Sequence, residues 1–177
     1  DIPVIAFSVG EEELSGIDTG PLVGHLAAWN YFMSVETDAN FDFIDVWLAF
    51  IGDEDRVTND PMEAHYVGFN LWVKAVEAAG TTEAGAVQDA IIGLSVPNLS
   101  GGTATMLANH HITKPVLIGE IQDDGQFLVV SATADTVPGD AWSDYLEGSR
   151  DLIADWSEPV RCGNFNKEAR TCIGSSP

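Results

Sequence analysis

The sequence predicts an α/β fold in which parallel sheets are flanked by helices. Short, fully apolar runs such as residues 4–7 alternate with segments of helical period, which is typical of buried parallel strands joined by helices. The longest helical segment carries capping residues at its start and a glycine at its end. With 177 residues, 45% of them hydrophobic, the chain is large enough for one compact domain with a core.

The first elements follow from local pattern. Residues 4–7 predict a buried strand, and residues 11–17 predict a short helix capped by Ser8, with Glu11 completing a capping box. A second apolar run, residues 22–32, predicts a strand because it has β-type residues and no helical period.

Three helices are predicted next. Residues 41–51 repeat apolar side chains at spacings of three and four. The strongest prediction is a helix over residues 61–79, with Asp60 as its N-cap and Gly80 ending it. Residues 84–94 predict a shorter helix.

The last predicted elements are a hairpin and a tail. Residues 100–103 read as a loop, and the runs 116–121 and 127–131 flank an Asp-Gly turn that predicts a β-hairpin. This hairpin belongs either to the edge of the same sheet or to a separate structure. Residues 142–156 predict a partly helical segment.

Charge and composition narrow the function classes. Seven Lys and Arg face 28 Asp and Glu, for a formal net charge of −21. This field repels nucleic acid and anionic lipid, and it suits neutral or cationic partners, although it is equally explained by solubility alone. The sequence contains no run of 18 apolar residues, so no transmembrane helix is predicted. The chain opens at Asp1 on an apolar run, so we expect a processed, trimmed or truncated chain whose signal peptide, if any, lay upstream.

The two cysteines, Cys162 and Cys172, are separated by nine residues in a polar tail. They predict a disulfide that closes a short loop, stabilises by about 2–3 kcal/mol and indicates an oxidising compartment. Two free thiols are the alternative. Further Cys or His ligands for a metal are missing nearby, so no metal site is predicted.

The turn after the first strand is the first candidate site. In open α/β sheets, ligands bind beyond the carboxyl ends of strands, where helix starts offer free N–H groups. Ser8 and Gly10 hold that place, and Glu11 adds an acceptor for ligand N–H groups. The alternative is a helix start whose glutamates only favour the helix dipole.

Two further clusters have simpler explanations. His110 and His111 are adjacent and alternate faces on a strand, so a structural or surface role is favoured over a shared metal. Asp60, Glu63 and His65 could form an acid–base cluster beside Tyr66, but capping explains the two carboxylates. The chain also lacks a nucleophile elbow, a P-loop, a Gly-x-Gly-x-x-Gly and a His-Glu-x-x-His motif, so no enzyme is predicted.

A resemblance to a known family is carried by residues 4–14, 24–32, 59–66, 109–111, 119–121 and 138–145. These stretches resemble the urea-binding proteins of bacterial ABC-type urea transporters. This resemblance implies a type I periplasmic-binding fold, related to short-amide and branched-chain amino-acid receptors, with two α/β lobes joined by three crossovers around the ligand. The chain would then be the C-terminal part of a longer protein.

The resemblance also implies a division of the chain. Residues 1–58 would be the remainder of the C-terminal lobe with a hinge strand, and residues 59–132 the remainder of the N-terminal lobe. Residues 133–177 would form a crossover and the C-terminal tail. Residues 29–32 and the segment before Pro61 would be crossovers.

The ligand contacts that the resemblance implies lie on both lobes. They are Ser8, Val9, Gly10, Glu11, Asn30, Tyr31, Glu63 and Tyr66, with Asp60 on the same wall as Glu63. Ser8 and Glu11 are the leading pair. Further contacts would come from the part of the protein that precedes this chain.

The implied function is that of a periplasmic, or otherwise extracytoplasmic, protein without enzymatic activity or cofactor. It would capture urea or a short amide and deliver it to the permease subunits of an ABC transporter, with no nucleic-acid binding or membrane insertion. The alternatives are an amide-sensing receptor ectodomain and an amide hydrolase. An ammonia-release assay would separate the hydrolase from a binding protein.

Overall fold

The computed structural model describes residues 2–140, 145, 147, 165–166 and 171–172, and the chain divides into two compact units, Asp1–Gly139 and Asp140–Pro177. In the second unit, β7 (Phe165–Asn166) pairs antiparallel with β8 (Thr171–Cys172). The predicted helix over 142–156 lies almost wholly outside the described residues. The predicted disulfide also lies outside them, through Cys162.

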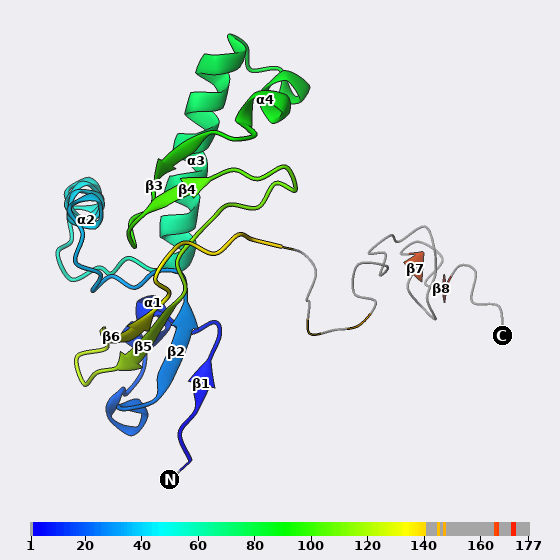
Figure 1. Cartoon of the computed structure of the whole chain (residues 1–177). Coiled ribbons are helices and arrows are strands. Elements are labelled where there is room, and N and C mark those ends of the chain that lie inside the picture. Colours follow the sequence, from blue (N-terminus) through cyan, green and yellow to red (C-terminus); the bar gives the residue numbers. More distant parts are fainter. Residues whose placement is uncertain (1, 141–144, 146, 148–164, 167–170, 173–177) are drawn as a thin grey trace. The chain divides into compact units, whose positions relative to one another are not determined.

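A mixed four-stranded sheet forms one part of the first unit (Figure 1). Its order is β1-β2-β5-β6, where β1 is Ile5–Ala6, β2 is Leu26–Trp29, β5 is Leu117–Ile121 and β6 is Phe127–Ala132. Only β1 and β2 are parallel, because β5 and β6 return as a hairpin whose first strand pairs antiparallel with β2. The α/β class is therefore confirmed, but the sheet is mixed and not parallel throughout. The hairpin lies in this same sheet, with β6 at its edge.

The second predicted strand is shorter than expected. Residues Gly20–Leu22 form a 3-10 turn, η1, and Gly24 adopts a φ of 84°, a left-handed conformation that glycine tolerates. These two features delay the start of β2 to Leu26. An apolar run alone could not distinguish the turn from the strand.

The sheet has its own hydrophobic core. Helix α1 (Glu11–Ser15) contributes Leu14 to it, and the Phe32 and Phe127 rings stack with centroids 4.4 Å apart. The N-cap of α1 is Gly10 and not the predicted Ser8. Glu13 Oε2 accepts the Gly10 N–H at 2.8 Å, so the turn is closed by a different carboxylate from the one expected. We call residues 5–32 together with 117–132 the sheet region.

A second core belongs to one continuous stretch, residues 60–105, which we call the helical region. It contains α3 (Asp60–Ala79), α4 (Ala84–Ile91) and a small hairpin of β3 (Ser95–Pro97) and β4 (Thr103–Thr105). Its buried members are Val67, Leu71, Val96 and Ala104. Sequence pattern missed this hairpin because its strands have three residues each.

Helix α3 confirms the strongest helix prediction. Pro61 lies in its first turn and Gly80 ends it with a φ of 65°. The N-cap is Asn59 and not Asp60, because Asn59 Oδ1 accepts the Met62 N–H at 3.1 Å. Asp60 is therefore available for the contacts described below.

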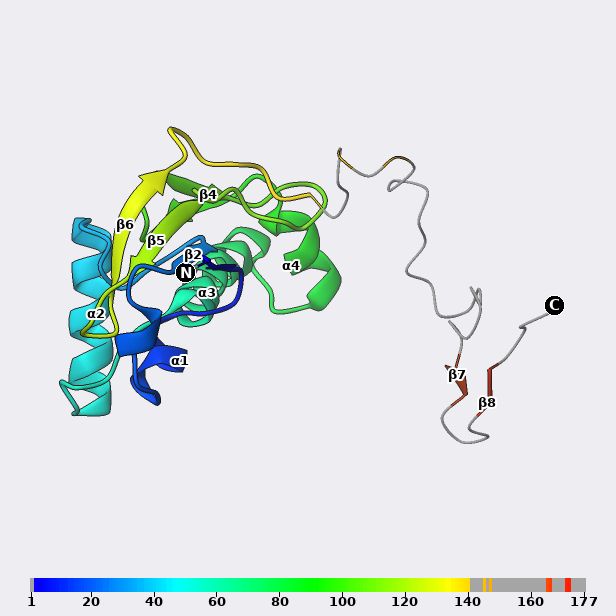
Figure 2. The same cartoon turned by 90° about the horizontal axis from the view of Figure 1, so that it is seen from below.

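Helix α2 (Asp38–Ile51) lies on the opposite side of α3 from α4 (Figure 2). It starts three residues before the predicted position because Thr37 caps it, accepting the Asn40 N–H at 3.1 Å. Phe43 of α2 joins Tyr31 and Leu99 in a third buried cluster. The predicted assignment of residues 1–58 and 59–132 to two lobes stays a prediction, and β5 and β6 place residues 117–132 in the sheet region.

Candidate functional site

Two chain segments, residues 33–59 and 106–116, join the sheet region to the helical region, and side chains at their ends contact one another. The Asn30 N–H donates to Asp60 Oδ2 at 3.0 Å. The Asn30 side-chain amide donates to the Pro115 carbonyl at 2.7 Å. Residues around positions 30, 60 and 115 therefore meet at one place, which we call the junction.

Glu11 reaches the junction from the turn after β1. The side chain is 1% exposed, and its Oε1 accepts the Met33 N–H at 2.6 Å. Its Oε2 is buried and has no hydrogen-bond partner among the described residues. The turn packs closely because Gly10 has no side chain: a Cβ there would lie 3.3 Å from the Trp29 ring.

Tyr31 lies at the centre of the junction and is fully buried. Its hydroxyl donates to Asn40 Oδ1 at 2.7 Å and shares a hydrogen bond of 2.6 Å with Thr58 Oγ1. Asn40 in turn donates to the Met33 and Val35 carbonyls. This network holds residues 31–35 against the start of α2.

Lys114 is the cation of the junction. Its ammonium group donates to Glu63 Oε2, and the pair is almost fully buried. The other oxygen of this carboxylate, Glu63 Oε1, is buried without a hydrogen-bond partner in the described part of the chain. One ammonium group therefore serves a site that holds three buried carboxyl groups, Glu11, Asp60 and Glu63.

Burial dominates the electrostatics of these carboxyl groups. It raises the pKa of Glu11 to about 7 against the Met33 hydrogen bond, which lowers it. Burial also raises the pKa of Asp60 to about 6, although Lys114 opposes the rise. Burial also raises the pKa of Glu63 above its ordinary value, although Lys114 opposes the rise. Burial likewise raises the pKa of Tyr31.

The junction brings together four of the eight predicted contact residues, Glu11, Asn30, Tyr31 and Glu63. Gly10 packs beside them. The two remaining turn residues point elsewhere: Ser8 is exposed and Val9 packs against the core of the sheet region.

Tyr66 lies apart from the junction carboxylates. It is 41% exposed, and its ring lies 4.8 Å from that of Phe43, beside an apolar cavity of about 690 Å³ that Trp47 and Phe69 also line. Whether any of these residues contacts a ligand stays a prediction.

Sequence reasoning missed Lys114 and Asn40. Lys114 had a usable signal, since it is one of only seven basic residues and stands directly before the apolar segment that forms β5. Asn40 had none, because its role depends on Tyr31 being buried against it. Within the described residues, no group of three or more His, Cys, Asp or Glu side chains is placed to hold a metal ion.

Residues 1–148 match the family described as "Periplasmic binding protein domain", and the chain therefore belongs to this family. The described part of the chain contains no helix that is both long and apolar enough to cross a membrane.

Solved structures of ABC transporter solute-binding proteins share its fold. One, from Rhodopseudomonas palustris HaA2 in complex with p-hydroxybenzoic acid, aligns with a TM-score of 0.63 at 22% identity, over 77% of this chain and 37% of that one. An amino acid ABC transporter substrate-binding protein from Pseudomonas fluorescens Pf-5 aligns with a TM-score of 0.63 at 21% identity, over 81% and 38%. A leucine binding protein from Thermotoga maritima aligns with a TM-score of 0.56 at 16% identity, over 69% and 34%. The chain thus spans little more than a third of the length of these proteins.

A curated relative carries a different description. The limonene hydroxylase of Geobacillus stearothermophilus is 27% identical over 115 residues, which are 65% of this chain and 21% of the relative. The family and the solved structures are described as binding proteins, and the hydroxylase matches only through this small share of its length.

Proposed function

We propose that this chain is part of an extracytoplasmic solute-binding protein that captures urea or a short amide and delivers it to an ABC permease. Membership of the periplasmic binding family over residues 1–148 supports the general role. The observation that carries the ligand class is the surplus of buried acceptors at the junction, where Glu11 Oε2 and Glu63 Oε1 have no partner among the described residues.

Such acceptors are matched by N–H groups. Leaving a buried polar atom unpaired costs about 1–3 kcal/mol. A ligand that donates hydrogen bonds to these oxygens removes this cost when it binds. Urea has four N–H donors, and a carboxylate that accepts them makes a charge-assisted bond. Four heavy atoms at about −1.5 kcal/mol each allow roughly −6 kcal/mol, a Kd of tens of micromolar.

The carboxyl groups of the junction also disfavour anionic ligands. Asp60 and Glu63 share one ammonium group, that of Lys114, which is already paired with Glu63, and Glu11 adds a third buried carboxyl group. An aromatic acid such as the p-hydroxybenzoate of the Rhodopseudomonas relative would add a carboxylate to this site without a free cation to meet it. We therefore favour neutral or cationic N–H-rich solutes.

Entry of the solute requires the junction to open. Ser8 is exposed at the rim of the turn, whereas Glu11 behind it is 1% exposed. A hinge motion of the two connecting segments would uncover Glu11, and closure around the solute would create the surface that a permease recognises.

Calorimetry on the longer protein that contains this chain tests the proposal. Urea, acetamide and formamide should release heat at micromolar to millimolar concentrations, while 4-hydroxybenzoate and leucine should not. Binding of only the aromatic acid or leucine would refute the ligand class, and ammonia release from urea would favour a hydrolase.

A pair of variants locates the site. At pH 8, where the Glu11 carboxyl is ionised, Glu11→Gln should weaken urea binding by about tenfold, because a charged acceptor is lost. Glu12→Gln is the matched control, since Glu12 is exposed and pairs with Arg56 at 3.3 Å. Equal affinities of the two variants would remove Glu11 from the site.

A further inference from the structure

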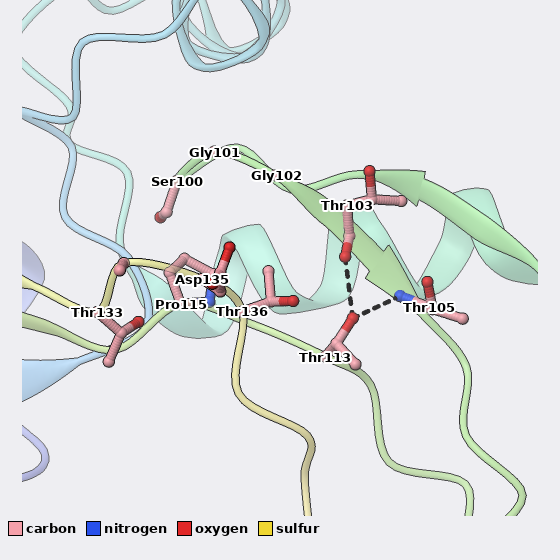
Figure 3. Close-up of a pocket in the computed structure, with 11 residues that line it drawn as sticks. Ser100, Gly101, Gly102, Thr103, Thr105, Thr113, Pro115, Thr133, Asp135 and Thr136 are labelled. Carbon is pink, nitrogen blue, oxygen red and sulfur yellow. Dashed lines mark hydrogen bonds between the residues drawn. The ribbon is translucent and has the colours of Figure 1, made fainter.

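A second cavity, of about 500 Å³, lies between the turn that joins β3 to β4 and the segment that follows β6 (Figure 3). Its lining is rich in hydroxyl groups, from Ser100, Thr103, Thr105, Thr113, Thr133 and Thr136. Glu11 and Glu63 do not line it, so this cavity is distinct from the carboxylate pair of the junction. Its volume is typical of sites for small molecules.

Hydrogen bonds hold the walls of the cavity in place. Thr113 Oγ1 donates to the Thr103 carbonyl at 2.9 Å and accepts the Thr105 N–H at 3.0 Å, as the dashed lines in Figure 3 show. On the other wall, Thr133 Oγ1 accepts the Val116 N–H at 3.1 Å. The cavity is therefore built on side chains that are already positioned.

The turn that closes the cavity depends on two glycines. Gly101 and Gly102 have φ values of 98° and 70°, which other residues rarely adopt. A Cβ on Gly102 would lie 3.1 Å from the Thr136 methyl group, so the two walls approach closely at this point.

One polar atom of the lining lacks a partner. Ser100 Oγ is buried and makes no hydrogen bond within the described part of the chain. In Figure 3 its hydroxyl points away from the turn, toward the side formed by Thr133 and Pro115. Since a buried unpaired hydroxyl costs about 1–3 kcal/mol, an occupant that bonds to it would be stabilised.

The chemistry of the lining defines the occupant. Hydroxyl groups both donate and accept, and none of the described residues that line the cavity is Lys, Arg or His. An anion would meet Asp135 without a compensating cation, and an apolar ligand would leave the buried Ser100 hydroxyl unpaired. A molecule with several neighbouring hydroxyl groups satisfies both kinds of partner.

We propose that this cavity binds a small uncharged polyol. Its walls come from the helical region and from the segment that follows β6, so a bound polyol would bridge the two and favour one arrangement of them. This proposal is independent of the urea proposal, because the two sites use different residues.

The test is a titration of the 177-residue chain with ribitol, followed by amide chemical shifts. Saturating shifts should appear at Gly101, Gly102 and Thr136, with a Kd on the order of 1 mM. Urea and 4-hydroxybenzoate should leave these amides unchanged at the same concentrations. Shifts that grow linearly and spread over the surface would mean a solvent effect and overturn the proposal.

Two variants and a control complete the test. Ser100→Ala and Thr136→Val should each weaken ribitol binding about fivefold, the loss of one hydrogen bond. Ser131→Ala removes an exposed hydroxyl of β6 outside the cavity and should bind as the parent chain does. Thr136 follows β6 in a connecting segment, so its variant should fold even if the Ser100 variant does not. Unchanged binding by Thr136→Val would overturn the proposal.

Discussion

The helical region is made from one continuous stretch of chain, residues 60–105, whereas the sheet region joins β1 and β2 to a hairpin that follows about 90 residues later. The first region closes short loops and places its core by local contacts. Pairing β2 with β5 closes the long loop between them, which costs more conformational entropy than the short loops of the helical region. The contacts of the junction, where the segments that join the two regions meet, should therefore matter most for the stability of the sheet region.

Replacing Lys114 should have the largest effect, because it tests whether the junction couples the two regions. Lys114→Met leaves Glu63 buried without its ammonium partner, at a cost of about 3–5 kcal/mol in the free energy of unfolding. Thermal unfolding followed by circular dichroism measures this loss. Lys74→Met is the control, since Lys74 is exposed and donates to the Ser95 carbonyl. A loss of less than about 1 kcal/mol at Lys114 would show that the regions are held together by other contacts.

The pH dependence of stability should isolate Glu11 within the same junction. Its pKa is raised from 4.5 to about 7 by burial, so the folded chain retains a proton that the unfolded chain has lost between these pH values. Stability from this group is full below pH 4.5 and falls by about 3 kcal/mol as the pH rises through 7.

Denaturation curves at pH 5 and pH 8 check this dependence. Glu11→Gln should flatten the decline, whereas the exposed Glu12→Gln should leave it unchanged. An equal decline in the Glu11 variant would assign the pH dependence to Asp60, whose pKa is raised to about 6.

A matched pair of glycine substitutions sharpens the difference between the two regions. A Cβ at Gly119 of β5 would lie 2.8 Å from the Phe32 ring, so Gly119→Ala should cost about 2 kcal/mol through overpacking. Gly68 of α3 has open space around it, so Gly68→Ala should stabilise by about 0.5–1 kcal/mol through helix propensity. Thermal unfolding of both variants measures the two signs. Destabilisation by Gly68→Ala would contradict the view that α3 has free space there.

The smallest effect is expected at the surface ion pair between Arg56 and Glu12. The groups are 3.3 Å apart, with side chains 46% and 43% exposed, so solvent screens them. Arg56→Gln should change the free energy of unfolding by less than about 0.5 kcal/mol. The stability of the Arg56 variant is measured at low and at high salt. A large loss of stability at low salt that disappears at high salt would show that the ion pair has a larger role.

Much of the fold could be predicted wherever the signal is local. The helix over 61–79 was predicted because Pro61, the apolar period and Gly80 lie within that segment, and the hairpin around the Asp-Gly turn was predicted for the same reason. The predicted N-caps were wrong by one or two residues: the structure has Gly10 in place of Ser8 and Asn59 in place of Asp60. Neighbouring polar residues compete for the same orphan N–H groups, and local sequence does not decide between them.

The candidate site was predicted only in part. The turn at residues 8–11 was predicted as a ligand site from its position after a strand, and Glu63 became a candidate because it lies at a helix start. The place of Lys114 before an apolar segment indicated burial, but the sequence around it does not identify its ion-pair partner, Glu63, 51 positions away.

The sequence by itself determined the α/β class, the long helix and the acidic character of the chain, because composition and periodicity are properties of contiguous residues. Only the tertiary structure decided that the sheet is mixed, that Glu11 is buried and that Lys114 is the cation beside Glu63. Burial and charge pairing depend on which distant segments pack together, and these set the pKa of Glu11 and the unpaired acceptors from which a ligand is inferred.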